Sequence, residues 1–152
     1  MPIPRRAVNA SLAGVLLGSA TSPLMAAAKD PRVTMNACGP LQAWCFVPAE
    51  LDSARAPIVA VHGISRNARE HLDAFRLYAS QTGRIVVAPH FSQERFDGYQ
   101  RLDQGRPRAD EALIGLTKTL VRQYGLTHQA FDLFGFSGGA QFGHRFALHH
   151  PQ

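Results

Sequence analysis

The sequence has few features that would place it in a specialised class of protein. Only two of its 152 residues are cysteines. Its early apolar run, residues 10–20, is much shorter than the ~20 residues of a membrane-spanning helix. The 16 basic and 11 acidic residues give a formal net charge of +5, and the basic residues are scattered rather than clustered. We therefore expect no membrane anchor and no nucleic-acid surface. The chain also has no internal repeat, and its length favours one domain.

The first 28 residues have the pattern of a secretory signal peptide. Two arginines form a basic start, an apolar run follows at residues 10–20, and small residues at 26–28 provide a cleavage site. The sequence thus predicts export to the periplasm or the exterior, with residues 29–152 as the mature domain. An amphipathic helix at the start of the mature protein is the alternative interpretation.

The two cysteines, Cys38 and Cys45, follow this segment closely. An exported protein meets an oxidising compartment, and the Gly39-Pro40 pair between the cysteines can make the turn of a small disulfide loop. Both the bonded and the free state stay open, because geometry decides between them. Neither cysteine has histidine or cysteine neighbours that would complete a zinc site, so we expect no bound metal.

Apolar runs alternate with helical patterns from residue 57 onward. Residues 57–62 and 84–89 are mostly apolar, as strands buried on both faces of a parallel sheet are. The segment between them fits a helix that begins near Asn67, with a capping box to Glu70, and ends near Gly83. This alternation predicts an α/β fold with a mostly parallel sheet flanked by helices. The other expected elements are strands at 42–47 and 131–134 and helices at 108–124 and 138–148.

A polar stretch at residues 90–107 has no clear period and is long for a connection, which is typical of a functional or a disordered loop. It leaves the carboxyl end of a predicted strand, where substrate sites form in open α/β sheets. We therefore expect its basic and aromatic side chains to edge a substrate site; a solvated loop without such a role is the alternative. These side chains are Arg95, Arg101, Arg106 and the adjacent Arg108, with Phe96 and Tyr99.

A G-x-S-x-G motif at residues 135–139 directly follows an apolar strand and precedes a predicted helix. In this context the serine sits on a sharp turn, with its hydroxyl exposed at the carboxyl end of a parallel sheet. Glycines are expected at Gly135 and Gly139 because the backbone passes too close there for a Cβ. We predict that Ser137 is a catalytic nucleophile. A glycine-rich turn that serves packing alone is the alternative.

A second element supports this prediction. The His62-Gly63 pair ends an earlier predicted strand, and an oxyanion hole in this architecture combines one N–H from the residue after the nucleophile with one from such a loop. We therefore expect the Gly138 and Ile64 N–H groups to be the two donors, with Ser65 as the alternative to Ile64. His62 itself is expected to pack beneath the loop rather than to act as a base.

A catalytic base and its acid are missing from the sequence. The order Ser, then Asp or Glu, then His would place both after Ser137. His144, His149 and His150 do follow it, but too closely to return over the sheet edge. Asp132 is expected to point into the structure rather than at the serine. The sequence therefore predicts one member of a catalytic triad, with the acid and the histidine beyond Gln152.

Together the His-Gly turn, the strand at 84–89, the helix that has Asp110 near its start and the Gly-Phe-Ser-Gly-Gly motif resemble exported α/β-hydrolases. The resemblance is to the esterase and polyhydroxybutyrate-depolymerase-like group, and it covers roughly residues 57–151, the N-terminal half of such a domain. It implies serine-dependent hydrolysis of small or polymeric esters, without a metal or an organic cofactor. It also implies that later strands pair with the far edge of the strand before Ser137. Without them, we expect that edge to be unpaired and the chain to be nearly inactive.

Two other functions fit the same residues. An exported peptidase of this fold would use the same serine, since the motif does not distinguish an ester from an amide. A binding module that keeps the hydrolase shape would not use it. The sequence does not indicate acyl-chain preference or oligomeric state.

Overall fold

The computed structural model of the protein describes residues 31–38, 40–102 and 107–151, and the side chain of Cys38 is not included. The predicted signal peptide, residues 1–28, therefore lies outside the described residues.

Within the described residues, five strands form one mixed sheet in the order β1-β2-β4-β3-β5. The last three strands of this order are parallel to one another, whereas β2 runs antiparallel to both of its neighbours, β1 and β4. The predicted α/β class is thus confirmed, with an antiparallel hairpin added at one edge. The strands are β1 (Arg32–Cys38), β2 (Leu41–Val47), β3 (Ile58–Val61), β4 (Val86–His90) and β5 (Asp132–Gly135).

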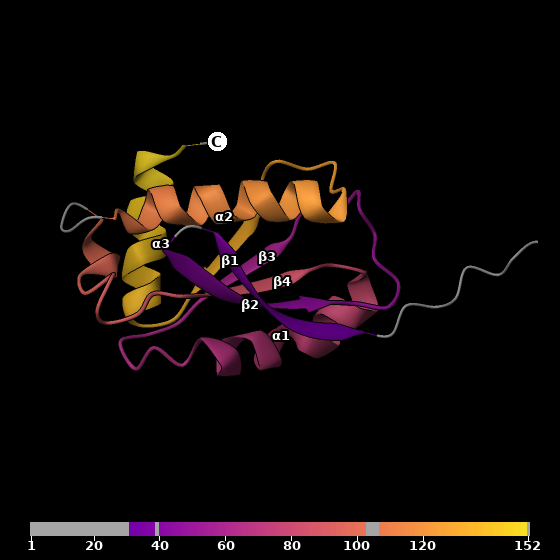
Figure 1. The fold of residues 1–152 in the computed structure, drawn as a ribbon, viewed down its shortest axis with the longest axis horizontal. Helices are drawn as coiled ribbons and strands as arrows, with labels where there is room; N and C mark the ends of the chain where they lie inside the picture. Colours follow the sequence, from indigo (N-terminus) through magenta and orange to yellow (C-terminus); the bar gives the residue numbers. More distant parts are fainter. Residues whose placement is uncertain (1–30, 39, 103–106, 152) are drawn as a thin grey trace, which may run out of the picture.

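The three α-helices of the described ranges cover both faces of the sheet (Figure 1). Helix α1 (Ala68–Thr82) lies on one face, and α2 (Ala109–Tyr124) and α3 (Gly138–His149) lie on the other. A short 3₁₀ helix, η1 (Tyr99–Arg101), packs against α3. None of the helices in the described ranges is both long and apolar enough to cross a membrane.

Two apolar clusters hold these layers together. One face of the sheet and α1 share a cluster that includes Phe46, Ile58 and Leu72. The opposite face packs with α2 and α3 around a larger cluster that includes Leu116 and Phe142. Burial on both faces explains why the strands at 58–61 and 86–90 read as continuous apolar runs in the sequence.

The first helix begins and ends where the sequence places it, but its capping box is absent. The Asn67 side chain makes no capping bond to a backbone N–H; its amide instead donates to the Glu70 carboxylate at 2.5 Å. At the other end Gly83 takes the left-handed conformation, with φ 66°, and its N–H bonds the Ala79 carbonyl. The glycine therefore stops the helix as expected.

Strand β1 was not predicted from the sequence, and its pairing with β2 decides whether Cys38 and Cys45 can form a disulfide. In the β1–β2 hairpin Cys38 lies opposite Leu41, whereas Cys45 lies opposite Thr34. The two cysteine positions are thus four residues apart along the hairpin, about 13 Å at strand spacing and well beyond the reach of a disulfide. Cys45 is a buried free thiol, and burial raises its pKa to about 11.

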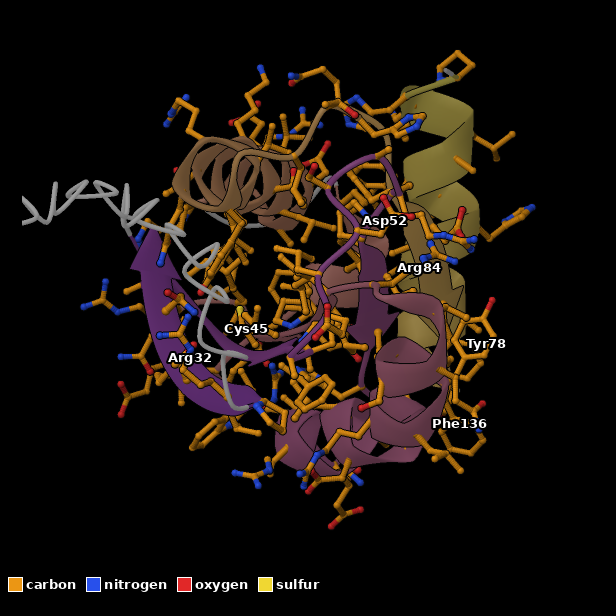
Figure 2. All side chains as sticks on the ribbon, turned by 90° about the vertical axis from the view of Figure 1, so that its right-hand side faces the viewer. Arg32, Cys45, Asp52, Tyr78, Arg84 and Phe136 are labelled. Atoms are coloured by element: carbon orange, nitrogen blue, oxygen red, sulfur yellow. The ribbon has the colours of Figure 1, made fainter. Side chains whose placement is uncertain are left out.

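At the other edge of the sheet, β5 pairs with β3 on one side and with no strand of the described residues on the other, as expected. Phe134 and Phe136 beside this edge are 42% and 62% exposed. Figure 2 shows Phe136 at the margin of the molecule, whereas Cys45 lies inside. Two large apolar side chains are therefore exposed beside the open edge of the sheet.

A buried carboxylate joins the start of α2 to the end of α3. The Asp110 side chain is fully buried, accepts from Arg108 Nη2 at 2.5 Å and bonds His150 Nε2 at 2.9 Å. Burial alone raises the pKa of Asp110, but the hydrogen bonds from Arg108 and His150 outweigh it and lower the pKa to about 2. The ionised carboxylate is thus part of the native packing.

Replacing this carboxylate should destabilise the fold in a pH-dependent way. We expect Asp110→Asn to lower the free energy of unfolding by ~1–3 kcal/mol at pH 7, because the amide accepts fewer hydrogen bonds. Since the native pKa of Asp110 lies below its unfolded value, the carboxylate stabilises above about pH 4 and this contribution is lost as the pH falls toward 2. Urea-induced unfolding at pH 7 and at about pH 2.5 measures both effects.

The matched control is Asp73→Asn, which removes an exposed carboxylate bound to Arg69 and Arg76 on α1. Exposed ion pairs contribute ~0–1 kcal/mol, so this variant should unfold almost as the wild type does. Equal losses in the two variants at pH 7 would contradict the role given to Asp110.

Candidate active site

Ser137 occupies the turn between β5 and α3, and its backbone is strained. It has φ 52° and ψ −115°, and its side chain is exposed. A residue other than glycine held in such a region costs of order 1–3 kcal/mol, and such strain clusters at functional sites. The structure thus places the predicted nucleophile on a sharp, exposed strand-to-helix turn.

The glycines two positions from the serine allow this turn to form. A Cβ on Gly135 would lie 2.2 Å from the Gly139 carbonyl oxygen. A Cβ on Gly139 would lie 2.3 Å from the Val61 oxygen and 2.6 Å from the His62 oxygen. The steric role expected for both glycines is therefore confirmed. The first turn of α3 lies directly against the backbone at the end of β3.

This contact brings the His-Gly turn beside the serine. A Cβ on Gly63 would lie 3.4 Å from Ser137 Cβ, and one on Gly138 would lie 3.5 Å from the Ile64 nitrogen. Ser137, Gly138 and Ile64, which the sequence assigned to one site, are therefore neighbours in the fold.

The amides at this junction have the property that an oxyanion hole requires. Neither the Ile64 nor the Gly138 N–H has a hydrogen-bond acceptor among the described residues. The Ser65 N–H is also unpaired there, and its hydroxyl donates to Asn67 Oδ1 at 2.9 Å. The proximity of Ile64 to Gly138 favours Ile64 as the second donor. Two N–H groups are thus available beside an exposed hydroxyl.

His62 supports the loop from below, as the sequence predicts. It is completely buried, and burial lowers its pKa to about 4, so the imidazole is neutral at pH 7. Its Nε2 accepts the Phe91 N–H at 3.1 Å, which leaves the proton on Nδ1 to be donated to the Gly63 carbonyl at 2.8 Å. Both ring nitrogens are therefore committed to backbone groups, and His62 is not available as a base.

Two other candidate groups, Asp132 and His150, are also engaged elsewhere. Asp132 was expected to point inward, but it is exposed and pairs with Arg84 at the end of β5 remote from Ser137. His150 binds Asp110 beyond the far end of α3, about 18 Å along the helix from its first residue. His71 of α1 contacts the ring of Phe136. No set of three metal-ligating side chains occurs in the part of the chain that the structure describes.

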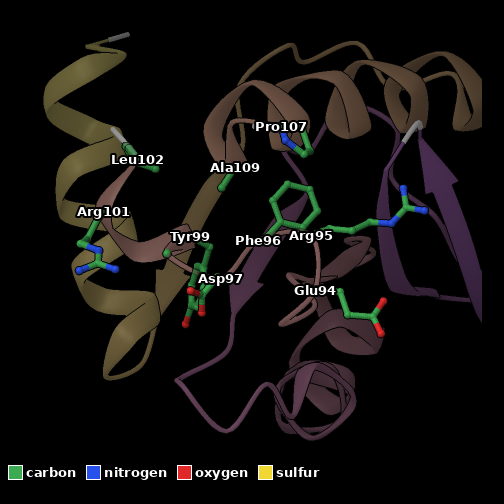
Figure 3. A pocket seen from close by; sticks show the side chains of 10 residues that line it. Glu94, Arg95, Phe96, Asp97, Tyr99, Arg101, Leu102, Pro107 and Ala109 are labelled. Atoms are coloured by element: carbon green, nitrogen blue, oxygen red, sulfur yellow. The ribbon is translucent and has the colours of Figure 1, made fainter. Parts of the chain in front are cut away.

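The loop after β4 is partly core, contrary to expectation. Phe96 and Tyr99 were expected to edge a substrate site, but both are almost fully buried and belong to the cluster under α2 and α3. Arg95 and Arg101 of this loop are exposed, beside a hollow of about 230 Å³ (Figure 3). Arg106 lies outside the described residues, and Arg108 is bound to Asp110.

Comparison with known proteins places this geometry in a familiar fold. The sequence matches no protein-family model and no curated protein. Poly(aspartic acid) hydrolase-1 from Sphingomonas sp. KT-1 is similar in structure, with a TM-score of 0.66 and 22% identity over 77% of this chain and 50% of that one. A protein from Nostoc sp. PCC 7120 assigned to the α/β-hydrolases gives a TM-score of 0.53 and 15% identity over 80% of this chain and 40% of that one. The chain has an α/β-hydrolase fold.

A third similar structure agrees with the resemblance seen in the sequence. The poly(3-hydroxybutyrate) depolymerase from Bordetella parapertussis has a TM-score of 0.57 and 24% identity over 77% of this chain and 46% of that one. The expected likeness to esterases and depolymerases is thereby confirmed at the level of the fold. The chain spans about half the length of these similar proteins or less.

Strain at Ser137 can be measured through two substitutions that both remove its hydroxyl. Glycine tolerates a positive φ, whereas alanine retains the strain. We therefore expect Ser137→Gly to be more stable to urea than Ser137→Ala by ~1 kcal/mol. A more stable alanine variant would contradict the strained turn.

Close packing of α3 on β3 can be tested with two glycines of the same helix. Gly139→Ala should lower the free energy of unfolding by ~3 kcal/mol, because its methyl group meets backbone that cannot move aside. Gly143→Ala is the control, since its Cβ would only touch Leu133 at 3.7 Å and alanine favours the helix by ~0.5–1 kcal/mol. Similar unfolding curves for the two variants would be inconsistent with the contact.

Proposed function

We propose that the chain is the N-terminal half of an exported serine hydrolase that cleaves carboxylic esters through an acyl-enzyme on Ser137. The observation that carries the proposal is the junction of β5, α3 and the turn after β3. An exposed serine with φ 52° lies there beside the unpaired N–H groups of Ile64 and Gly138. Preorganised donors of this kind stabilise the negative oxygen of a tetrahedral intermediate.

The proposed chemistry takes two steps. Ser137 Oγ attacks the ester carbonyl as a general base takes its proton, and the carbonyl oxygen becomes an anion held by the Gly138 and Ile64 N–H groups. The intermediate collapses, the C–O bond to the alcohol breaks, and the alcohol leaves with that proton. Water then attacks the acyl-enzyme and releases the acid and the free serine. No step needs a metal or an organic cofactor.

The base and its acid are proposed to come from polypeptide that follows the described residues. His62 has both ring nitrogens bound to backbone groups, His150 Nε2 bonds the Asp110 carboxylate, and Asp132 pairs with Arg84. This chain covers only 50% and 46% of two similar hydrolases, and the rest of their length leaves room for both residues. Export is proposed from the signal-peptide pattern of residues 1–28.

Labelling of the protein expressed from its complete gene tests the proposal. A fluorophosphonate should label one serine per molecule, and Ser137→Ala should abolish the label and lower kcat for p-nitrophenyl esters by about 10⁶-fold. Ser65→Ala is the matched control, because Ser65 is an exposed serine on the neighbouring turn and its N–H survives the change. Absence of labelling in the wild type would refute a catalytic role and favour a binding module.

A peptidase or amidase of the same fold is the second candidate. The turn at Ser137 does not distinguish an ester from an amide, and one similar structure is a poly(aspartic acid) hydrolase. Rates on p-nitrophenyl esters and on peptide p-nitroanilides decide between the two. Turnover of anilides at rates equal to or above those of esters would favour amide hydrolysis.

A further inference from the structure

One arginine side chain ties the turn after β3 to the loop after β4. The guanidinium of Arg66 donates to the backbone carbonyls of Phe91, Phe96 and Asp97. The contacts to Phe96 and Asp97 are 3.2 and 3.0 Å long, and Nε also donates to the Gln93 side chain at 2.9 Å. All four acceptors belong to residues 91–97. The planar fork of an arginine suits several fixed acceptors at once, whereas a lysine ammonium does not.

The backbone of Arg66 is itself part of the turn. Its φ is 57°, a left-handed conformation that residues other than glycine rarely adopt, and its N–H bonds the Gly63 carbonyl at 3.0 Å. Such a conformation persists only where surrounding contacts hold it. The guanidinium contacts therefore hold the turn that carries Ile64.

Tyr99 completes the connection. Its ring stacks on Phe91 with centroids 5.0 Å apart, and the Arg66 guanidinium lies over the same ring at 5.4 Å. Its hydroxyl donates to the His62 carbonyl at 2.7 Å. The Tyr99 hydroxyl oxygen would lie 2.9 Å from a Cβ on Gly138, so it is also close to the second proposed oxyanion donor, the Gly138 N–H. Burial raises the pKa of Tyr99 to about 12, so the hydroxyl stays a donor at neutral pH.

We infer that Arg66 and Tyr99 are positioning residues that hold the Ile64 N–H in line with the Gly138 N–H. Neither residue is assigned a contact with substrate; each acts through the backbone of residues 62–66. The inference rests on the proposed function, because it concerns the oxyanion hole of that site. Losing one oxyanion donor costs ~10²–10³ in kcat, and a misplacement of about 1 Å costs up to ~10²-fold.

Kinetics of the protein expressed from its complete gene test the inference. We expect Arg66→Met to lower kcat for a p-nitrophenyl ester by ~10–100-fold with KM nearly unchanged, because the donor acts on the transition state. Affinity for a trifluoromethyl ketone, which leaves an oxyanion on the adduct, should fall in parallel. Arg66→Lys should recover only part of the loss, and Tyr99→Phe should lower kcat by ~5–10-fold through the lost hydrogen bond to His62.

Arg69→Met is the matched control. Arg69 lies three positions along the chain, binds the Asp73 carboxylate at 2.9 Å and stacks over Trp44 at 5.0 Å, but its side chain is 44% exposed. Its replacement removes an ion pair and a cation–π contact of an arginine away from the site, so kcat should stay within about twofold of the wild type. All assays are run well below the unfolding midpoint of each variant, so a loss of global stability does not lower kcat.

The outcomes separate the two proposals. If the wild type has no turnover that depends on Ser137, the proposed function fails and the inference fails with it. If the wild type is active but Arg66→Met and Tyr99→Phe keep wild-type kcat and ketone affinity, the inference alone is overturned. A lower unfolding temperature with unchanged kcat also overturns it, because the role is then structural only. If Arg66→Met does not fold, Tyr99→Phe decides the question.

Discussion

The site depends on one backbone contact, the seating of the first turn of α3 against the end of β3. Gly139 lies so close to the Val61 and His62 carbonyls that no side chain fits between them. This approach sets where Ser137 stands relative to the turn at residues 63–66. It also accounts for the strain at Ser137, because the chain must reverse sharply between Gly135 and Gly139 to make the contact. Strain of this kind is stable only where the packing around it is rigid.

A second set of contacts gives that rigidity from the other side. The turn after β3 is bound through its own peptide groups, with the His62 ring below it and the Arg66 guanidinium beside it. Burial keeps His62 neutral, so the loop carries no buried imidazolium at pH 7. The backbone that carries the unpaired N–H groups near Ser137 is thus held by side chains whose own polar groups are hydrogen-bonded. Electrostatic preorganisation requires two N–H groups that are free to bind the oxyanion, on a backbone that other hydrogen bonds hold in place.

Local patterns in the sequence were sufficient for the α-helices, for strands β2 to β5 and for the serine turn. Continuous apolar runs predicted β3 and β4, and the glycines at 135 and 139 predicted a close approach that the structure confirms.

The features that the sequence did not predict depend on contacts between segments that lie far apart in the chain. Arg66 and the carbonyls of residues 91–97 lie about 30 positions apart, and no local pattern marks them. Tyr99 was predicted to edge a substrate site, because its neighbours in the sequence are polar and do not indicate that its ring packs in the core. None of the described side chains of strand β1 is fully buried, and its sequence shows only a weak alternation of polar and apolar positions.

The most direct test of the account is a crystal structure of the protein from its complete gene after reaction with a phosphonate ester. The account predicts phosphorus bound to Ser137 Oγ, with one phosphonyl oxygen about 2.7–3.1 Å from the N–H groups of both Ile64 and Gly138. A phosphonyl oxygen directed away from these amides, or an adduct on any other residue, would contradict it.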